Sequence, residues 1–230
     1  MTARADARPL AIDLYCGLGG WTEGLLAEGF YVVGFDTERH QYGDAKYPAQ
    51  LVLQDVLTLH GRQFRDAALI VASPPCQEFS YMAMPWSKAK EKEDRLKYGH
   101  EEDRKRLTAL FDACFRIQHE ACEAAGRHIP LVVENVRGAQ KWVGRSRWNY
   151  GSFHLWGDVP SLMPMTRADG VKQHKSGRAW FADPDSISGA TSSKSNARKA
   201  ASATIAKIPF ALAKWIAHYW HPRGDSAQRG

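Results

Sequence analysis

Apolar runs and helical spacings alternate between residues 10 and 135. Short runs rich in Val, Ile, Leu and Ala predict strands that are buried on both faces; they occupy residues 10–15, 31–35, 50–53, 66–72 and 130–133. Apolar side chains three and four positions apart predict helices over residues 21–29 and 107–125. Buried strands separated by helices are typical of an α/β fold with a mostly parallel sheet and helices on both faces. This is the fold class that we expect.

The pattern weakens outside those elements. Residues 81–106 are rich in Lys, Glu, Asp and Arg, which indicates either a solvated loop and helix face or a mobile lid. Residues 158–196 lack apolar periodicity, so we expect an irregular insertion there. Residues 201–220 predict a helix that Pro209 either kinks or begins.

Polar residues follow the predicted strands at the points where the strands end. Asp36, Asp55, Cys76 and Glu134 all stand at such ends. Ligands of open parallel sheets bind outside the carboxyl ends of the strands. The sequence therefore predicts a site that combines these four side chains.

The first predicted strand runs into a glycine-rich turn, Gly17-Leu18-Gly19-Gly20. Such a turn accommodates a nucleotide-type ligand, although it also serves plain packing of a strand against a helix. A carboxylate at the end of the second strand, Asp36, suits both ribose hydroxyls, and Asp55 suits an adenine amino group. Together the three features indicate an adenosine ligand.

The segment Pro74-Pro75-Cys76-Gln77-Glu78-Phe79-Ser80 holds a cysteine between rigid prolines and a polar stretch. A thiolate that adds to the electron-poor C6 of cytosine makes C5 nucleophilic, so that C5 can attack the methyl group of a sulfonium donor. Glu134 can stabilise the base by donating from a protonated carboxyl to N3 and accepting from the exocyclic amine.

These motifs, in this order, resemble those of the cytosine-C5 DNA methyltransferase family. The matching segments share their order with the family over most of the chain; they are Asp13 to Trp21, Gly34 to Glu38, Gln54-Asp55-Val56, Pro75 to Ser80 and Glu134-Asn135-Val136. The resemblance implies the Rossmann-like fold of S-adenosylmethionine-dependent methyltransferases. It also implies that the target cytosine is flipped out of double-stranded DNA to reach the cysteine.

The resemblance assigns roles to individual residues. Cys76 is the expected nucleophile and Glu134 the expected base-stabilising acid. Arg145 and Arg147 match the two arginines of the family's Gln-x-Arg-x-Arg motif, with Val143 in place of its Gln, and are expected near the base or the thiol. The expected contacts of S-adenosylmethionine are Tyr15, Cys16, Gly17, Gly19, Gly20, Trp21, Asp36, Thr37, Asp55, Val56 and Pro75.

The chain departs from the family at two places. Only residues 158–196 are left for target recognition, between a catalytic domain at residues 1–157 and a helix at residues 197–230 that completes it. Near the end, Ile205-Ala206-Lys207-Ile208-Pro209 stands where the family has Gly-Asn-x-Val/Ile-Pro. Lys207 is either a surface lysine or a partner for an extra anion on the donor. The second alternative implies carboxy-S-adenosylmethionine as donor and 5-carboxymethylcytosine as product.

The composition of the chain does not decide whether its partner is DNA or RNA. The formal net charge of +6 suits a polyanionic partner but does not choose between DNA and RNA. A branch of the family methylates transfer RNA, and a catalytically silent DNA-binding module is a third alternative, although the intact Cys76 and Glu134 argue against it. We expect a monomer. We expect it to be cytoplasmic, because no apolar stretch is long enough for a membrane span and none forms a secretory signal. We expect no metal and no disulfide, because the four cysteines include no Cys-x-x-Cys pair.

Overall fold

The computed structural model describes residues 8–76, 79, 101–163, 199–200, 203–204 and 206–222. Its centre is a seven-stranded sheet in the order β5-β2-β1-β6-β7-β9-β8. The strands are β1 (Leu10–Leu14), β2 (Tyr31–Asp36), β5 (Gln50–Leu53), β6 (Ala67–Ala72), β7 (Leu131–Asn135), β8 (Trp148–Tyr150) and β9 (Phe153–Gly157). The first five of these strands pair in parallel, and β9 and β8 pair antiparallel. The predicted mostly parallel α/β sheet is therefore confirmed.

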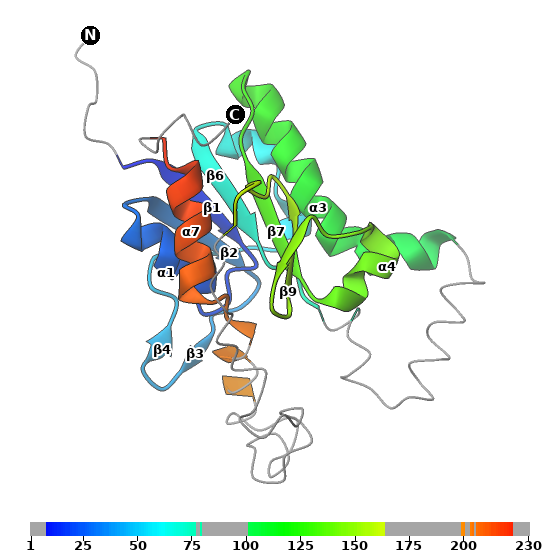
Figure 1. Ribbon diagram of the computed structural model, residues 1–230, viewed down its shortest axis with the longest axis horizontal. Helices are drawn as coiled ribbons and strands as arrows, with labels where there is room; N and C mark the ends of the chain where they lie inside the picture. The colour runs from blue at the N-terminus through cyan, green and yellow to red at the C-terminus, as the bar shows by residue number, and fades with distance from the viewer. Residues whose placement is uncertain are drawn as a thin grey trace.

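Helices cover both faces of the sheet (Figure 1). The principal helices are α1 (Gly20–Ala27), α3 (Glu101–Ala125) and α7 (Phe210–Trp220), and α4 (Gln140–Val143) is a single turn. Short 3-10 turns are η1 (Val56–Thr58), η2 (Gly61–Phe64) and η4 (Arg137–Ala139), and a small hairpin joins β3 (Gln41–Tyr42) to β4 (Ala45–Lys46). Helices α1 and α7 lie together on one face, and α3 crosses the other.

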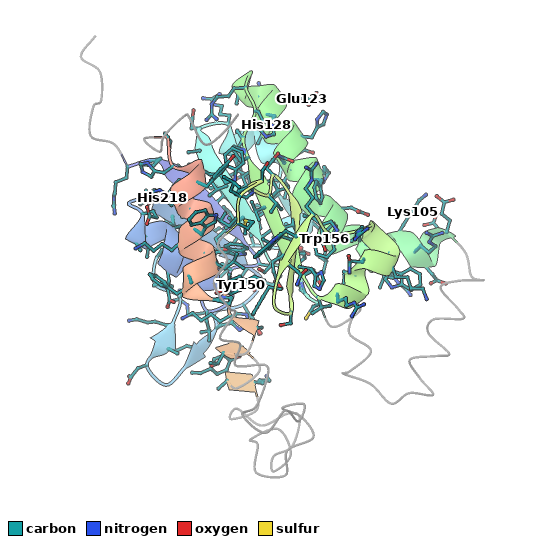
Figure 2. All side chains as sticks on the ribbon, in the orientation of Figure 1. Lys105, Glu123, His128, Tyr150, Trp156 and His218 are labelled. Atoms are coloured by element: carbon teal, nitrogen blue, oxygen red, sulfur yellow. The ribbon has the colours of Figure 1, made fainter. Side chains whose placement is uncertain are left out.

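The two cores follow from the two-residue period of the strands. Ile12 and Leu14 of β1 point into the cluster under α3, whereas Ala11, one position before Ile12, points into the cluster under α1 and α7. On the α3 side, the Trp156 ring of β9, which is labelled in Figure 2, meets Phe111 edge to face at a centroid distance of 5.3 Å. Burial on both faces explains why the central strands read as continuous apolar runs rather than as alternating ones.

Close backbone approach fixes α7 on α1. A Cβ atom added at Gly24 would lie 2.4 Å from the main chain at Ala213. Pro209 is the residue before the first turn of α7, with φ −58° and ψ 133°. Of the two alternatives for Pro209, the structure therefore favours a helix start over a kink.

Three elements differ from the expectation. Helix α3 begins at Glu101, so residues 101–106 belong to a helix whose first turn carries three acids, a favourable arrangement at a helix N-terminus. The antiparallel β8–β9 pair and the β3–β4 hairpin had no clear alternation in the sequence and were not predicted. The rest of the candidate lid, residues 81–100, lies outside the described residues, as do residues 164–196 of the expected insertion.

None of the helices within the described ranges is long and apolar enough to cross a membrane.

Candidate active site

A cavity of about 500 Å³ opens at the carboxyl ends of the parallel strands. The predicted site residues on its wall are Tyr15, Cys16, Gly17, Gly20, Trp21, Asp36, Thr37, Asp55, Val56, Pro75, Cys76, Glu134 and Lys207. A volume of this size is in the range of ligand pockets. The strand ends that carry polar residues therefore do meet in one place, as the parallel sheet requires.

The glycine-rich turn after β1 is held tightly from both sides. The Gly19 N–H donates to the Cys16 carbonyl at 2.7 Å, and the Cys16 N–H donates to the Phe35 carbonyl at 3.1 Å. Tyr15 adopts a φ of 58°, a left-handed conformation that is uncommon for a residue with a side chain. Gly19 is not on the cavity wall; it lets the turn pass Pro48, whose Cδ would lie 2.5 Å from an added Cβ. Its role in the structure is to close the turn.

Asp36 connects the end of β2 to this turn. Its Oδ2 accepts the Gly17 N–H at 3.0 Å, and its Oδ1 accepts the Thr37 N–H at 2.8 Å. Burial would raise the pKa of this carboxyl, but hydrogen bonds from His40 and from the Gly17 N–H outweigh it and lower the pKa. Asp36 is therefore ionised at neutral pH, which suits an acceptor for hydroxyl groups.

Asp55 stands at the start of η1. Its Oδ1 accepts the Leu57 N–H at 2.9 Å, so the side chain caps this turn while it lines the cavity. The hydroxyl of Tyr15 donates to the Leu110 carbonyl at 2.8 Å and so ties the cavity floor to α3.

The segment that carries Cys76 is fixed by contacts to its neighbours in the sheet. The Ser73 N–H donates to the Leu14 carbonyl at 3.1 Å, and the Trp21 Nε1–H donates to the Ser73 hydroxyl at 2.9 Å. The buried Asn135 side chain donates from Nδ2 to the Pro74 carbonyl at 3.0 Å. Cys76 follows these anchors directly and is only partly buried. Its thiol therefore stands at the edge of a rigid support.

Glu134 comes from β7, next to the strand that leads to Cys76. Its side chain is 7% exposed and lines the same cavity. The following residue, Asn135, is the one that holds the Pro74 carbonyl. One strand end thus supplies both an acid on the cavity wall and a support for the cysteine segment.

Arg145 and Arg147 lie apart from this group. Both are exposed, in the segment before β8, and neither lines the cavity. The Arg147 N–H donates to the Leu155 carbonyl at 2.8 Å, which extends the pairing of β8 with β9. Their expected contact with the base or the thiol stays a prediction.

Lys207 reaches the cavity from the segment before α7. Its Nζ lies 2.5 Å from the Glu23 Oε1 of α1. The segment packs closely on the glycine-rich turn, since a Cβ atom at Gly20 would lie 2.4 Å from the Ile208 nitrogen. Gly20 is therefore required for contact with the C-terminal segment.

Several cavity residues were missed by the sequence analysis. They are Leu18, Glu38, His40, Ser73, Pro74, Leu110, Val136, Ala203, Ala206 and Ile208. Glu38 and Val136 stood inside recognised motifs and could have been found there. His40 and Leu110 carried no local signal, because a turn and a helix bring them to the wall.

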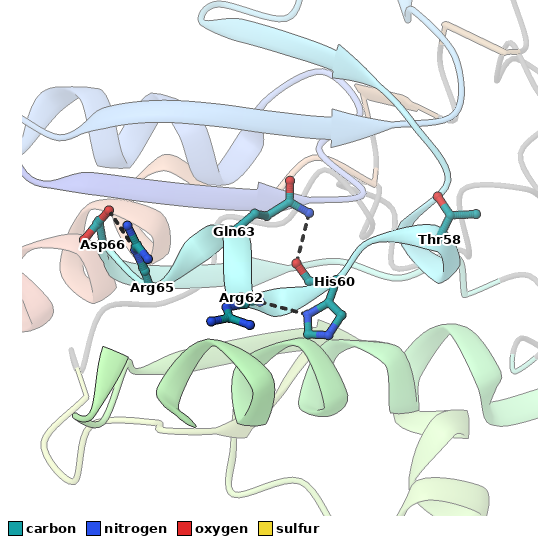
Figure 3. A pocket seen from close by; sticks show the side chains of 6 residues that line it. All are labelled: Thr58, His60, Arg62, Gln63, Arg65 and Asp66. Carbon is teal, nitrogen blue, oxygen red and sulfur yellow. Dashed lines mark hydrogen bonds and ion pairs between the residues drawn. The ribbon is translucent and has the colours of Figure 1, made fainter. Parts of the chain in front are cut away.

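A second hollow lies at η2 (Figure 3). It is lined by Thr58, His60, Arg62, Gln63, Arg65 and Asp66. Arg65 pairs with Asp66 at 3.8 Å, and the His60 Nδ1 lies 3.2 Å from Glu120 of α3. None of the predicted site residues lines it. In the part of the chain that the structure describes, no group of three or more His, Cys, Asp or Glu residues could hold a metal ion.

The residues on the cavity wall fit an adenosine-containing ligand. The ionised Asp36 offers acceptors to ribose hydroxyls, and Gly17, with φ 49° and no atom within 4 Å of an added Cβ, leaves room for close approach to the backbone. Expected donor contacts and the expected nucleophile share one wall, so two substrates can meet there.

Comparison with known proteins gave a family match and distant structural similarities. A family model described as C-5 cytosine-specific DNA methylase matches residues 10–141, more than half of the 230-residue chain. Comparison with curated protein sequences gave no match.

Similar solved structures include a protein described as a DNA modification methyltransferase encoded within a prophage of E. coli, at 20% identity and a TM-score of 0.36. That alignment covers 57% of this chain and 33% of the other. The Dnmt2 methyltransferase of S. pombe aligns at 18% identity and a TM-score of 0.37, over 60% of this chain and 37% of the other. This chain therefore spans little more than a third of the length of these structures.

Proposed function

The chain belongs to the C-5 cytosine-specific DNA methylase family, and from this membership we propose that it transfers a methyl group to C5 of cytosine in DNA. Its mostly parallel sheet is the Rossmann-like fold of such methyltransferases. The observation that carries the proposal is that Cys76 and Glu134 share one cavity with Asp36 and Asp55. A nucleophile and an acid for the base thus line the same space as the acceptors for an adenosine.

The donor that fits this space is S-adenosylmethionine, which supplies an electrophilic methyl group when it is bound. Asp36 accepts from the ribose hydroxyls through the lone pairs left by Gly17 and Thr37. Asp55 accepts from the adenine amino group, and Tyr15 and Val56 provide apolar surface for the ring. Trp21, Cys16 and Pro75 complete the wall toward Cys76.

Cys76 and Glu134 carry the chemistry on the base. The Cys76 thiolate adds to C6 and forms a carbon–sulfur bond, while Glu134 donates a proton to N3 and accepts from the exocyclic amine. The electron pair that develops at C5 attacks the methyl group, and the carbon–sulfur bond of the sulfonium breaks, which releases S-adenosylhomocysteine. Loss of the C5 proton to a base then expels the Cys76 thiolate, and N3 returns its proton to Glu134, which restores the aromatic ring and the starting form of the enzyme.

The ion pair of Lys207 with Glu23 supports the ordinary donor over the carboxylated one. The lysine charge is already balanced by a carboxylate at 2.5 Å, so a second anion would have to share the ammonium with Glu23 against the repulsion of its like charge. Mass spectrometry of nucleosides from treated DNA distinguishes the two donors when both are offered. We expect 5-methylcytosine; 5-carboxymethylcytosine that disappears in Lys207→Ala would contradict this choice.

Double-stranded DNA is the proposed partner. Basic side chains follow Glu134 between β7 and β8 at Arg137, Lys141, Arg145 and Arg147, where they can meet phosphates. Methyl transfer to duplex DNA should exceed transfer to a transfer RNA. The reverse preference would make the chain an RNA enzyme of the same chemistry, and transfer to neither would support a silent binding module.

Covalent trapping tests the mechanism. On duplex DNA with 5-fluorocytosine, the C5 fluorine cannot leave as a proton, so the adduct through Cys76 should accumulate with S-adenosylmethionine present. Cys76→Ala should give no adduct. Cys122→Ala is the matched control, because Cys122 lies on α3 and exchanges hydrogen bonds with the Ile129 backbone outside the cavity. Equal trapping by wild type and Cys76→Ala would refute the proposed nucleophile.

A further inference from the structure

His40 lies on the cavity wall beside the proposed ribose acceptor. Its Nε2 is 3.6 Å from the Asp36 Oδ1, and its Nδ1 is 3.5 Å from the Tyr42 hydroxyl and 3.8 Å from the Glu38 Oε1. The side chains of His40 and Asp36 are 21% and 14% exposed, so both are largely removed from solvent. The imidazole thus closes a chain of contacts that runs from Gly17 through Asp36 to the β3–β4 hairpin.

The groups that face this imidazole are acidic or neutral. Asp36 and Glu38 approach it from the end of β2, Tyr42 approaches from β3, and Asp55 stands further along the cavity wall. The hydrogen bond to Asp36 raises the pKa of His40, and its burial, which opposes this, is the smaller effect. His40 therefore keeps its proton to a higher pH than an unperturbed imidazole does.

We propose that His40 is a positioning residue that couples donor binding to its own protonation, with the donor bound more tightly when His40 is neutral. The inference rests on the proposed donor site, in which Asp36 receives the ribose hydroxyls. His40 orients that carboxylate by occupying one side of Oδ1.

Three effects give the coupling the same sign. A donor that fills the cavity removes water from His40, which disfavours its charged form. Backbone N–H groups already occupy some of the lone pairs of Asp36, and the ribose hydroxyls compete with the imidazolium for the others. The sulfonium of S-adenosylmethionine adds a like charge to the same cavity. By linkage, a ligand that lowers the pKa of His40 must itself bind less tightly when His40 is protonated.

The test is the pH dependence of S-adenosylhomocysteine binding to the full chain, measured by calorimetry between pH 5.5 and 7.5. This thioether lacks the sulfonium charge, so the assay measures the first two effects. The wild-type affinity should rise about fivefold or more across this range, the lower end of typical coupling between sites. His40→Gln, which keeps a hydrogen-bonding side chain without a titrating charge, should lose this dependence. His60→Gln is the matched control, because His60 sits in the outer hollow beside Glu120 and should leave the dependence unchanged.

Histidine NMR provides a readout that does not depend on activity. The resonance that disappears in His40→Gln identifies His40, and its pKa should fall when S-adenosylhomocysteine saturates the wild type. Two results would overturn this inference and leave the proposed donor site intact. One is that His40→Gln binds with the pH dependence of the wild type, and the other is that the ligand leaves the pKa of His40 unchanged. If His40→Gln does not fold, His40→Asn replaces it in the binding measurement, and selective histidine labelling of the wild type still follows the pKa of His40 with and without ligand. Absence of binding at every pH would overturn the proposed donor site and this inference with it.

Discussion

The replacement Asp13→Asn tests the buried carboxyl beneath the glycine-rich turn. Asp13 is 1% exposed on β1, and its Oδ2 accepts the Thr22 hydroxyl at 2.6 Å. Its Oδ1 is buried and has no hydrogen-bond partner in the described part of the chain. Burial raises the pKa of this carboxyl from 3.8 to about 7, and the hydrogen bond from Thr22 offsets only part of that effect.

The raised pKa makes folding stability depend on pH. Because the folded state holds its proton more tightly than the unfolded state, the stabilisation is complete below about pH 4 and is lost as pH rises toward 7. Between pH 5 and pH 8 this one group costs the wild type on the order of 2–3 kcal/mol of unfolding free energy. Asparagine keeps an acceptor for Thr22 and carries no charge, so the variant does not share that loss.

Urea unfolding followed by circular dichroism at pH 5, 6, 7 and 8 measures the effect. The unfolding free energy of Asp13→Asn minus that of the wild type should increase steadily with pH by about the amount above. Asp66→Asn is the surface control, because the Asp66 side chain is 83% exposed and its replacement should follow the wild type at each pH. A difference between Asp13→Asn and wild type that stays constant from pH 5 to pH 8 would show that Asp13 remains charged in the folded protein.

Two further changes probe packing and the support of the cysteine. Gly24→Ala places a methyl group 2.4 Å from the Ala213 carbonyl carbon, so α7 must shift. The unfolding free energy should fall by about 1–3 kcal/mol as a result. An unchanged melting temperature would contradict this contact. Asn135→Ala removes the bond to the Pro74 carbonyl, and single-turnover methyl transfer should slow roughly tenfold or more because Cys76 loses its position. In that variant S-adenosylhomocysteine should bind as in wild type, and transfer at the wild-type rate would argue against this support.

The strand pattern was predictable because the central strands are buried on both faces. Each predicted run matches an observed strand to within two residues, from β1 to β7. The edge pair β8–β9 was missed, since its residues, such as the exposed Asn149 beside the buried Tyr150, form too short a pattern to separate from a loop. Helix α3 also started earlier than expected, because charged residues form its first turn.

The sequence by itself determined that Asp36, Asp55, Cys76 and Glu134 would meet. Strand ends in a parallel sheet lie at one edge, so local pattern was enough to predict that the four residues share a cavity.

Tertiary packing decided what the sequence left open. Lys207 and Glu23, 184 positions apart, pair because α7 docks on α1, and His40 reaches Asp36 because the chain turns before β3. The high pKa of Asp13 arises in the same way, from burial by elements distant along the chain. Charge balance and desolvation depend on which surfaces come together, and no local spacing of residues carries that information.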